Sequence, residues 1–513
     1  MIWAVSVVRD TFMHQRTLPP FATLGAFLTY LAERDELETI AAPVSMHLEV
    51  TELHRRVLLG DGPALHFTRA LDRDGNSARM PVMANLFGTA RRVAWGLGTD
   101  VGGLEGLGEM LAFMRSPQPP QNLRQAHTML PAARGALRAR PKKVAPPWDW
   151  READPDFSLL PVQTCWPGDA GPLITWPVVV TRPPGLDDPS AYNLGIYRMQ
   201  VIDHDRAILR WLPMRGGAAH HRLWRERGEE MPVAVVIGAD PATLLVAVMP
   251  APEGVSELAL AGMIGERRAA VAACATIPLH VPASAEIVLE GTVSPTETAL
   301  EGPFGDHTGY YNAPEHYPVF RLKRLCLRDG ASYLTTFTGR APDEPSVLGA
   351  ALLEVFKPLL RQAIPEVVDV WMPSEACSYR IAVIAIAKRY AGQARRVMMG
   401  FWSLLPQFSM TKTIVVVDDD IDIRSWDDVM WALSTRMDPS RDLLLVERTP
   451  VDPLDFASPL EGLGGKMGLD ATCKIGAETN REWGVKLAMD VAITERVAER
   501  WWEFFPSKQG NAP

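Results

Sequence analysis

The sequence predicts a mixed α/β and α+β protein in four consecutive parts. Residues 161–340 hold many short strand patterns between turn residues, which predicts an antiparallel barrel or sandwich with one or two helices laid on it. Residues 341–513 alternate strand and helix patterns, which predicts an α/β domain with a mostly parallel sheet. A stretch rich in proline and basic residues, 117–160, is predicted to connect them to an N-terminal α/β segment, residues 1–116.

The N-terminal segment contains a helical pattern over residues 22–35, followed by a charged exit at residues 33–36. The apolar residues that recur at helical spacing are Leu24, Phe27, Leu28 and Leu31. In the connector, we interpret the basic cluster between residues 134 and 143 as a solvated face. Contact of this cluster with anionic lipid headgroups is the alternative.

The strand patterns of the central part suggest at least one hairpin and one helix start. Residues 193–202 and 207–212 flank a predicted hairpin turn at residues 203–206. Asp240 and Pro241 suit the N-cap and the first position of a helix. Further strands are predicted at 178–180, 232–237, 286–293 and 320–327, the last turned back by Asp329-Gly330 into 333–337.

The C-terminal part repeats a strand and helix rhythm. Its predicted helices are 348–360, 393–405 and 426–434, and its predicted strands are 367–370, 381–387, 414–417 and 443–446. We interpret the acidic run Asp418–Asp420 as an ordinary strand exit with N-capping rather than a ligand site. The glycine-rich stretch 462–468 lacks the spacing of a phosphate loop and is interpreted as a flexible or partner-facing loop.

Composition excludes several classes of protein. The chain has 513 residues, of which 47% are hydrophobic, so it can build real cores and wholesale disorder is excluded. A net charge of −9 without a concentrated basic face argues against a nucleic-acid partner. Five scattered cysteines without a C-x-x-C pair are typical of reduced thiols in a cytoplasmic protein. No apolar run reaches the length of a membrane span, so any membrane contact is expected to be peripheral.

The most informative stretch is Glu301 to Tyr311, Glu-Gly-Pro-Phe-Gly-Asp-His-Thr-Gly-Tyr-Tyr. Glycines and a proline prevent it from being plain helix, and they bring the carboxylates of Glu301 and Asp306 close in the chain. Two carboxyl groups on one rigid loop can push their pKa values apart, so that one remains an anion while the other holds a proton. The stretch therefore predicts a general acid, with a solvated surface turn as the alternative.

A second candidate stretch is Asn193 to Arg198. Strict alternation places Asn193 and Tyr197 on one face and Arg198 on the other, and Gly195 could allow a bulge. An arginine in a strand invites a carboxylate partner, for which Glu301 and Asp306 are the candidates, and a weak rim salt bridge is the alternative. By spacing alone, Arg210 to Gly217 either holds a phosphate or ends a hairpin, and Glu257 either has a role or only complements a helix dipole.

Taken together, these stretches resemble the UbiD family of decarboxylases. The resemblance runs from about residue 20 to 505 and is nearest to the branch that decarboxylates 3-polyprenyl-4-hydroxybenzoate in ubiquinone biosynthesis. It implies a split β-barrel, similar to FMN reductases, over residues 161–340, and an oligomerisation domain over 341–513. The matching segments are 193–200, 210–217, 238–243, 281–291, 301–311, 342–345, 397–400, 435–439, 455–459 and 466–470.

The resemblance also implies a cofactor and a metal. The cofactor is prenylated FMN, and the metal is Mn2+ at Asn193 and Glu257, with K+ as a further ion that the family allows. The residues implied to line the flavin are Ile196, Tyr197, Arg198, Arg210, Trp211, Leu212, Arg215 and Gly216. Some relatives have a metal-binding histidine where this chain reads Arg215-Gly216-Gly217, so two protein ligands are expected here rather than three.

By the same resemblance, Asp306 is the proton donor, and Glu301 and Arg198 complete a charge network around it. Burial beside Glu301 is expected to keep Asp306 protonated. Some relatives have glutamate at this position, and the shorter aspartate leaves room for a bulkier ring.

The implied reaction is decarboxylation of 3-polyprenyl-4-hydroxybenzoate to 2-polyprenylphenol, which makes the protein a carboxy-lyase. A relative that acts on another aromatic or α,β-unsaturated acid is the first alternative, and a non-catalytic flavin-binding assembly subunit is the second. A hydrophobic channel at the site would favour the lipid substrate, and a small closed pocket would favour the first alternative. Expected partners are a flavin prenyltransferase that supplies the cofactor and further copies of this chain, as a hexamer or a dimer. The expected location is the cytoplasm, with peripheral contact at the inner face of the cell membrane.

Overall fold

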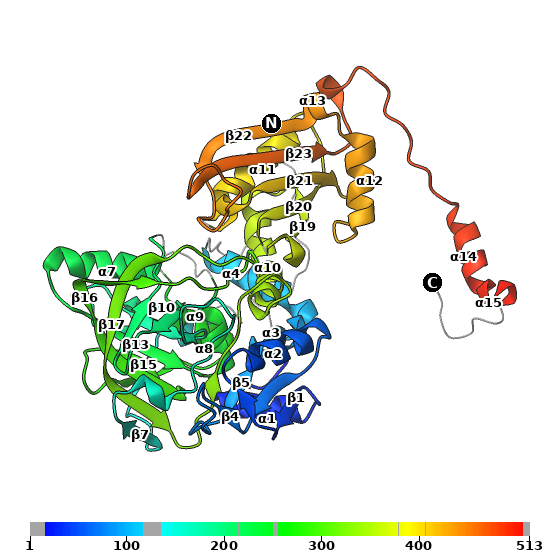
Figure 1. Ribbon diagram of the computed structural model, residues 1–513. Helices are drawn as coiled ribbons and strands as arrows, with labels where there is room; N and C mark the ends of the chain where they lie inside the picture. The colour runs from blue at the N-terminus through cyan, green and yellow to red at the C-terminus, as the bar shows by residue number, and fades with distance from the viewer. Residues whose placement is uncertain are drawn as a thin grey trace.

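The computed structural model describes residues 16–115, 135–213, 215–249, 255–377, 379–405 and 407–505. Within these residues the chain forms a nine-stranded sheet, a five-stranded sheet, a four-stranded sheet and two smaller ones. Figure 1 shows the nine-stranded sheet beside the N-terminal helices, with the five-stranded sheet above them. The mixed α/β and α+β class predicted from the sequence is confirmed. Residues 117–134 of the predicted connector lie outside the described residues.

The N-terminal segment packs helices around the four-stranded sheet, whose order is β1-β3-β5-β18. Helix α1 (Leu24–Ala32) begins at the N-cap Thr23 and buries Leu24, Phe27 and Leu31, as its apolar spacing predicts. The other elements are β1 (Leu37–Ile40), β2 (Val44–Ser45), α2 (Glu49–Leu59), β3 (Ala64–Phe67), β4 (Ala70–Leu71), β5 (Val82–Ala84), α3 (Ala90–Gly96) and α4 (Leu104–Arg115).

Strand β18 (Tyr333–Leu334) corrects one expectation. It does not fold back as a hairpin after Asp329-Gly330; it pairs in parallel with β5 of the N-terminal sheet. The backbone of Tyr333 donates to the carbonyl of Pro81 at 2.9 Å, and that of Thr335 donates to Met83 at 2.9 Å. The chain thus returns to the N-terminal segment after it has completed the central sheet.

The central sheet is antiparallel at every pair of its strands, in the order β10-β9-β13-β16-β17-β12-β11-β8, with β7 paired to β17. Its longest strands, β16 (Ile287–Glu301) and β17 (Glu315–Arg328), form a hairpin that Figure 1 shows curving around the sheet. The other strands are β7 (Trp150–Ala153), β8 (Leu173–Ile174), β9 (Val178–Thr181), β10 (Asn193–Ile196), β11 (Met199–Val201), β12 (Arg206–Leu209) and β13 (Met231–Ile237).

Residues 193–202 do not form the single strand predicted. The chain is β10 up to Ile196 and β11 from Met199, because β10 pairs with β9 whereas β11 pairs with β12 and β8 on the other side of the sheet. The hairpin between β11 and β12 is confirmed. Gly195 does not serve a bulge: a Cβ there would come within 2.5 Å of the Tyr197 hydroxyl oxygen, so glycine allows that ring to approach.

Three helices and a small sheet complete the central part. Asp240 and Pro241 begin helix α8, as predicted. The elements are α7 (Gly216–Arg227), α8 (Pro241–Val246), α9 (Glu257–Ile264), and the sheet of β6 (Lys142–Val144), β14 (Ala270–Ala273) and β15 (His280–Pro282).

The C-terminal domain is a five-stranded sheet of order β19-β20-β21-β23-β22, preceded by the long helix α10. The predicted parallel pairing is confirmed for the three central strands, whereas both edge strands run antiparallel to their neighbours. The elements are α10 (Glu344–Ala363), β19 (Val367–Trp371), β20 (Ile381–Ile386), α11 (Gln393–Leu404), β21 (Thr413–Asp418), α12 (Trp426–Arg436), α13 (Pro439–Asp442), β22 (Leu443–Pro450) and β23 (Leu463–Ala471).

The interpretation of residues 462–468 as a loop is wrong, because most of this stretch belongs to β23. Gly468 lies where a Cβ would come within 2.4 Å of the Met398 sulfur, so glycine is needed for α11 to pack on the strand. The acidic run after β21 does close that strand, but by ion pairing rather than by N-capping: Arg436 donates to Asp418 at 2.6 Å and to Asp420 at 2.8 Å.

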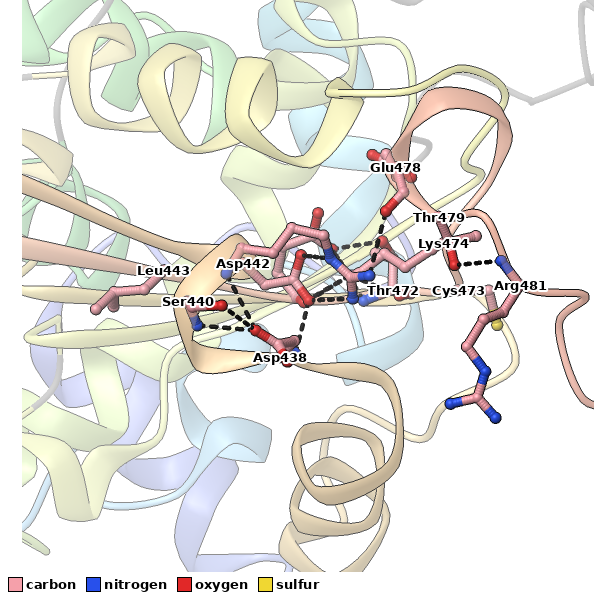
Figure 2. A network of polar contacts seen from close by, with 12 residues as sticks. Asp438, Ser440, Asp442, Leu443, Thr472, Cys473, Lys474, Glu478, Thr479 and Arg481 are labelled. Atoms are coloured by element: carbon pink, nitrogen blue, oxygen red, sulfur yellow. Dashed lines mark hydrogen bonds and ion pairs between the residues drawn. The ribbon is translucent and has the colours of Figure 1, made fainter.

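A buried lysine closes the end of β23. Lys474 is fully buried, donates to the Asp470 carboxylate at 3.0 Å and pairs with Asp442 at 3.3 Å (Figure 2). Beyond this network the chain leaves the domain as an arm that carries α14 (Val491–Glu499) and α15 (Trp501–Phe504), which Figure 1 shows standing apart from the body. Among the described residues, none of the helices combines the length and the apolar character that crossing a bilayer requires.

Candidate active site

The arginine in the break between β10 and β11 lies against two carboxylates. Arg198 donates through Nε to Glu301 Oε1 at 2.8 Å and through Nη2 to Glu301 Oε2 at 3.2 Å. Its Nη1 donates to Asp306 Oδ2 at 2.7 Å. The side chains of Glu301, Asp306 and Arg198 are 0%, 8% and 14% exposed. The arginine therefore meets both candidate carboxylates, and burial excludes the weak rim pair.

The two carboxylates come from different local structures. Glu301 is the last residue of β16, paired with Glu315 of β17, so the sheet fixes its position. Asp306 lies on the loop that joins these strands, where Asn312 holds the chain by accepting from the backbone of Phe304 at 2.8 Å and from Arg198 at 3.0 Å. Gly302 has a φ of 91°, which a residue with a side chain rarely adopts.

The electrostatics of Asp306 correct an expectation. Burial alone would raise the pKa of this carboxyl, but the hydrogen bond from His307 and the positive charges of Arg198, His307 and Arg210 together hold it well below its usual range. Arg210 Nη1 lies 3.3 Å from Asp306 Oδ2. Asp306 is thus an anion here and not the protonated acid expected from burial beside Glu301. The positive charges of Arg198, Arg210 and His307 outweigh the single negative charge of Glu301.

His307 is the residue that sequence reasoning missed. Its Nδ1 lies 2.9 Å from Asp306 Oδ1, and its Nε2 lies 3.0 Å from Asp452 Oδ2. Burial would lower the pKa of His307, but hydrogen bonds and charge from these two carboxylates raise it to about 9. Its place directly after Asp306 was the available signal, whereas Asp452 is 145 residues away in the chain.

A second cluster forms where helix α7 begins. The Tyr197 hydroxyl accepts from Asn193 Nδ2 and from the backbone of Gly217, both at 3.3 Å. A Cβ on Gly216 would come within 2.0 Å of Asn193 Oδ1, so the amide oxygen lies directly against the start of the helix. Unpaired backbone N–H groups and the helix dipole make such a start suitable for a phosphate.

Glu257 joins this cluster from the first turn of α9. Its Oε2 accepts from the backbone of Leu194 at 3.0 Å, which brings it beside Asn193. Burial raises the pKa of Glu257 to about 7. A buried carboxylate next to an amide oxygen is a donor set that suits a hard divalent cation. The two nearby histidines are engaged elsewhere, His220 with Thr181 at 2.9 Å and His221 with the Ser294 carbonyl at 3.1 Å.

The remaining predicted flavin residues surround the same region with different exposure. Trp211 is buried, and among the described residues neither its Nε1 nor the buried Nε of Arg210 has a hydrogen-bond partner. Such orphaned donors fit a ligand that would accept from them. Ile196 and Leu212 are half-buried, and Arg215 is exposed at the N-cap of α7. The structure thus places Arg210 beside Asp306. It places the ring of Trp211 beside that of Tyr197, with the two ring centroids 6.4 Å apart.

Three domain models of one family match the chain in order. They are described as the N-terminal, Rift-related and C-terminal domains of 3-octaprenyl-4-hydroxybenzoate carboxy-lyase, and they match residues 28–111, 140–341 and 346–471. The chain belongs to the UbiD family. The resemblance that the sequence motifs indicate is therefore confirmed over most of the chain.

Solved structures of UbiD-class enzymes share the fold over nearly the whole chain. HmfF from Pelotomaculum thermopropionicum, in complex with FMN, is 27% identical, with a TM-score of 0.74 over 93% of this chain and 99% of that one. Vanillic acid decarboxylase from Sedimentibacter hydroxybenzoicus, in a closed form, is 25% identical, with a TM-score of 0.78 over 96% and 99%. The 3,4-dihydroxybenzoic acid decarboxylase of Enterobacter cloacae, 21% identical with a TM-score of 0.72 over 94% and 99%, shares the fold.

Proposed function

We propose that this UbiD-family protein decarboxylates 3-polyprenyl-4-hydroxybenzoate to 2-polyprenylphenol with prenylated FMN and Mn2+. The observation that carries the proposal is the buried guanidinium of Arg198, shared between Glu301 and Asp306. A cation in this place can bind a substrate carboxylate, and an acid beside it can return a proton to the carbon that loses CO2.

The residues at the start of α7 fit the cofactor and its metal. Asn193 and Glu257 would hold Mn2+, and the helix start at Gly216 would hold the phosphate. Trp211 Nε1 and Arg210 Nε are buried donors, without partners in the described part of the chain, that the flavin could accept from. Ile196, Tyr197, Arg198, Leu212 and Arg215 would complete the lining, and K+ is a further ion that the family allows. When bound, the prenylated flavin supplies the electron sink that no side chain of the protein provides.

The protein's own residues bind the acid and move the proton. Arg198 orients the substrate carboxylate, and Glu301 holds Arg198 from the opposite side. A substrate carboxylate that takes Nη1 of Arg198 replaces Asp306 as its partner. Because Asp306 then loses an ion pair, its pKa rises and the carboxyl can accept a proton for delivery to the product. The protonated acid expected from the sequence is in this view a state of the substrate complex.

The substrate assignment rests on the family descriptions. All three matching models are described by an octaprenyl hydroxybenzoate enzyme, which supports the lipid substrate. The similar enzyme from Sedimentibacter hydroxybenzoicus, described as a vanillic acid decarboxylase, supports another aromatic acid as the second candidate. The cavity beside Arg198 has a volume of about 30 Å3, so either acid requires the site to open around it. Its lining residues are Cys165, Asp169, Leu173, Thr175, Arg198, Gly305 and Thr338.

The deciding experiment measures CO2 release by protein purified anaerobically after co-expression with a flavin prenyltransferase. A 3-polyprenyl-4-hydroxybenzoate and vanillate are offered separately, with Asp306→Asn as the control. Turnover of the prenylated acid that the control lacks supports the proposal, whereas turnover of vanillate alone moves the substrate to the smaller acids. Normal rates in Asp306→Asn would exclude the proton-donor role. Absence of bound flavin after co-expression would instead favour a non-catalytic assembly role.

We further propose a homo-oligomer, dimer or hexamer, built on the C-terminal domain, residues 341–513. One relative, HmfF, is described in an evolved dimeric form, 26% identical with a TM-score of 0.71 over 92% of this chain and all of that one. A cytoplasmic enzyme that touches the inner face of the cell membrane would reach a substrate held in the bilayer. Light scattering measures the oligomer size, and sedimentation with anionic vesicles measures the membrane contact.

A further inference from the structure

His307 connects the proposed proton donor to the C-terminal domain. We propose that His307, held as a cation between Asp306 and Asp452, stores the proton that Asp306 delivers to the product. His307 and Asp452 are then positioning residues for proton return, and contact between the C-terminal domain and the central sheet completes the donor. This inference rests on the decarboxylation proposed above.

The hydrogen bonds of His307 require both ring nitrogens to be donors. Nδ1 faces Asp306 Oδ1 at 2.9 Å and Nε2 faces Asp452 Oδ2 at 3.0 Å. Ionised carboxylates only accept, so both contacts are satisfied together only by the imidazolium. A backbone bond from His307 to the same Oδ1, at 2.8 Å, keeps the Asp306 carboxylate in line with the ring.

Asp452 is itself held by residues of the C-terminal domain. Its Oδ2 accepts from the Tyr379 hydroxyl at 2.6 Å and from Arg380 Nη2 at 3.1 Å. Its Oδ1 accepts from the backbone of Leu454 at 2.9 Å. Asp452 follows β22, and Tyr379 and Arg380 precede β20, so the far end of the contact belongs to the five-stranded sheet.

The charges around His307 are close to balanced. On the side of the central sheet, Asp306 is paired with Arg198 and Arg210. On the other side, Asp452 is paired with Arg380, and the Tyr379 hydroxyl lies 3.3 Å from Nε2. Asp343, the N-cap of α10, is a further carboxyl within electrostatic reach of the ring. Burial would lower the pKa of His307, but the two carboxylates in direct contact with the ring, Asp306 and Asp452, raise it to about 9.

The proton step is an exchange along one hydrogen bond. When Asp306 loses Arg198 to a substrate carboxylate, the Nδ1–H bond of His307 breaks and an O–H bond forms on Asp306 Oδ1. His307 becomes neutral, with its remaining proton on Nε2 directed at Asp452. Asp306 then gives the proton to the carbon that lost CO2, and His307 recovers one from water, since its side chain is 18% exposed. Each turnover consumes one proton, as decarboxylation requires.

A second contact crosses the same boundary. The ring of Tyr310, on the loop after β16, lies 6.1 Å from that of Phe456 in an edge-to-face arrangement. The two contacts join the proton-donor loop to the segment that follows β22. Separation of the two domains would remove Asp452 from His307, and the His307 pKa would lose one of the two carboxylates that raise it.

The first test reads the protonation of His307 without turnover. The full chain, labelled with 15N-histidine, is titrated by NMR as wild type, Asp452→Asn and Asp455→Asn, and the His307 signal is identified by its loss in His307→Gln. Asp455 is the matched control, since it pairs with Arg380 and Lys412 but has no hydrogen bond or ion pair with His307. Asp452→Asn should lower the His307 pKa by about one pH unit or more, and Asp455→Asn should leave it in place. Equal titration of His307 in all three proteins would overturn the inference.

The second test is the pH profile of kcat in the holoenzyme. Asp452→Asn should move the alkaline limb to lower pH, so that a shift of one pH unit gives about a twofold loss near pH 8, a loss that approaches tenfold above pH 9, and little loss near pH 6. Asp455→Asn should keep the wild-type limb. If folded Asp452→Asn keeps the wild-type alkaline limb, His307 does not store the proton, whereas the proposed decarboxylase activity still stands. If the wild type turns over no acid but the His307 pKa shifts as expected in the NMR titration, the proposed decarboxylase activity is refuted. The effect of Asp452 on His307 is then still supported. Should Asp452→Asn fail to fold, His307→Gln must lose the alkaline limb at reduced kcat for the store to stand.

Discussion

Arg198 and Glu301 form a bidentate ion pair in which the glutamate side chain is completely buried. The two N–O distances are 2.8 and 3.2 Å, and the carboxylate closes the end of strand β16. A fork of two parallel hydrogen bonds fixes the plane of the guanidinium, so its third nitrogen points at Asp306. The sheet thereby sets the direction from which a substrate carboxylate can be held.

Loss of Arg198 should cost folding stability as well as activity. Arg198→Gln leaves the Glu301 carboxylate buried without its cation, which should lower the free energy of unfolding by about 3 to 5 kcal/mol. The matched control is Arg151→Gln, since Arg151 pairs with Asp329 at 2.6 Å with both side chains about half exposed. That change should cost less than about 1 kcal/mol. Urea unfolding of both variants measures the difference, and equal costs would contradict the reasoning.

Gly216→Ala should weaken retention of the flavin and the metal. The added Cβ would fall within 2.0 Å of Asn193 Oδ1 and force this amide away from the start of α7. Gly349→Ala serves as the control, because Gly349 lies exposed within α10 and a Cβ there meets nothing within 4 Å. We expect flavin absorbance after dialysis to fall by tenfold or more, on the order of 1.4 kcal/mol, only in Gly216→Ala. Full retention would show that the approach of Asn193 is not needed.

Asn193→Ala should release Mn2+ and flavin together. Removal of the amide oxygen would take one of the two proposed protein donors from the metal, which would lie beside the phosphate site proposed at the start of α7. The control is Asn76→Ala, since Asn76 bonds only to Asp72 in an exposed turn among its described side-chain contacts. Metal content by mass spectrometry and flavin content by absorbance are measured on the same dialysed sample. Unchanged flavin after loss of Asn193 would separate the two sites.

The His307–Asp452 contact should make stability depend on pH in a defined window. The folded pKa of His307, about 9, lies above its ordinary value near 6.5, so its contribution is complete below pH 6.5 and is lost as pH rises through 9. Burial would raise the pKa of Asp452, but bonds from His307 and Tyr379 lower it to about 2, so its contribution is complete above its ordinary value near 3.9 and is lost as pH falls through 2.

Thermal unfolding across pH 4 to 10 measures this dependence. The wild-type melting temperature should fall between pH 6.5 and 9 by several degrees, and His307→Gln should show a flatter curve over that interval. A histidine outside the contact provides the control: His204, 73% exposed in the β11–β12 turn, can be changed to glutamine without flattening the curve. Parallel curves for His307→Gln and wild type would mean that the imidazolium does not stabilise the fold.

Local patterns predicted the elements well where the packing was also local. Helix α1 and the β11–β12 hairpin follow from apolar spacing and turn residues alone. Strand pairing at a distance did not follow, since nothing near Tyr333 indicates that β18 completes the N-terminal sheet. The glycines of β23 are typical of a loop in the sequence, and the approach of Met398 that requires glycine at position 468 comes from some 70 residues earlier in the chain.

The site divides in the same way. The partnership of Arg198 with Glu301 and Asp306 could be expected, because an arginine in a strand must find a carboxylate and the motif offered two. The negative charge on Asp306 could not be expected from the sequence, since it depends on Arg210 and His307 as well as on Arg198. Asp452 could not be predicted, because a lone aspartate after a strand has no sequence pattern that ties it to a histidine 145 residues earlier.

The contact between His307 and Asp452 limits where the protein can be divided into working fragments. A fragment that ends after residue 341 would retain the matched Rift-related domain, the donor loop and every proposed metal and flavin ligand, yet it would lack the aspartate that faces His307. Such a fragment could be a competent flavin carrier and a poor decarboxylase, above all in alkaline solution. Swapping the C-terminal domain, residues 341–513, between relatives should then exchange the pH range of the enzyme while leaving its cofactor chemistry in the part that was kept.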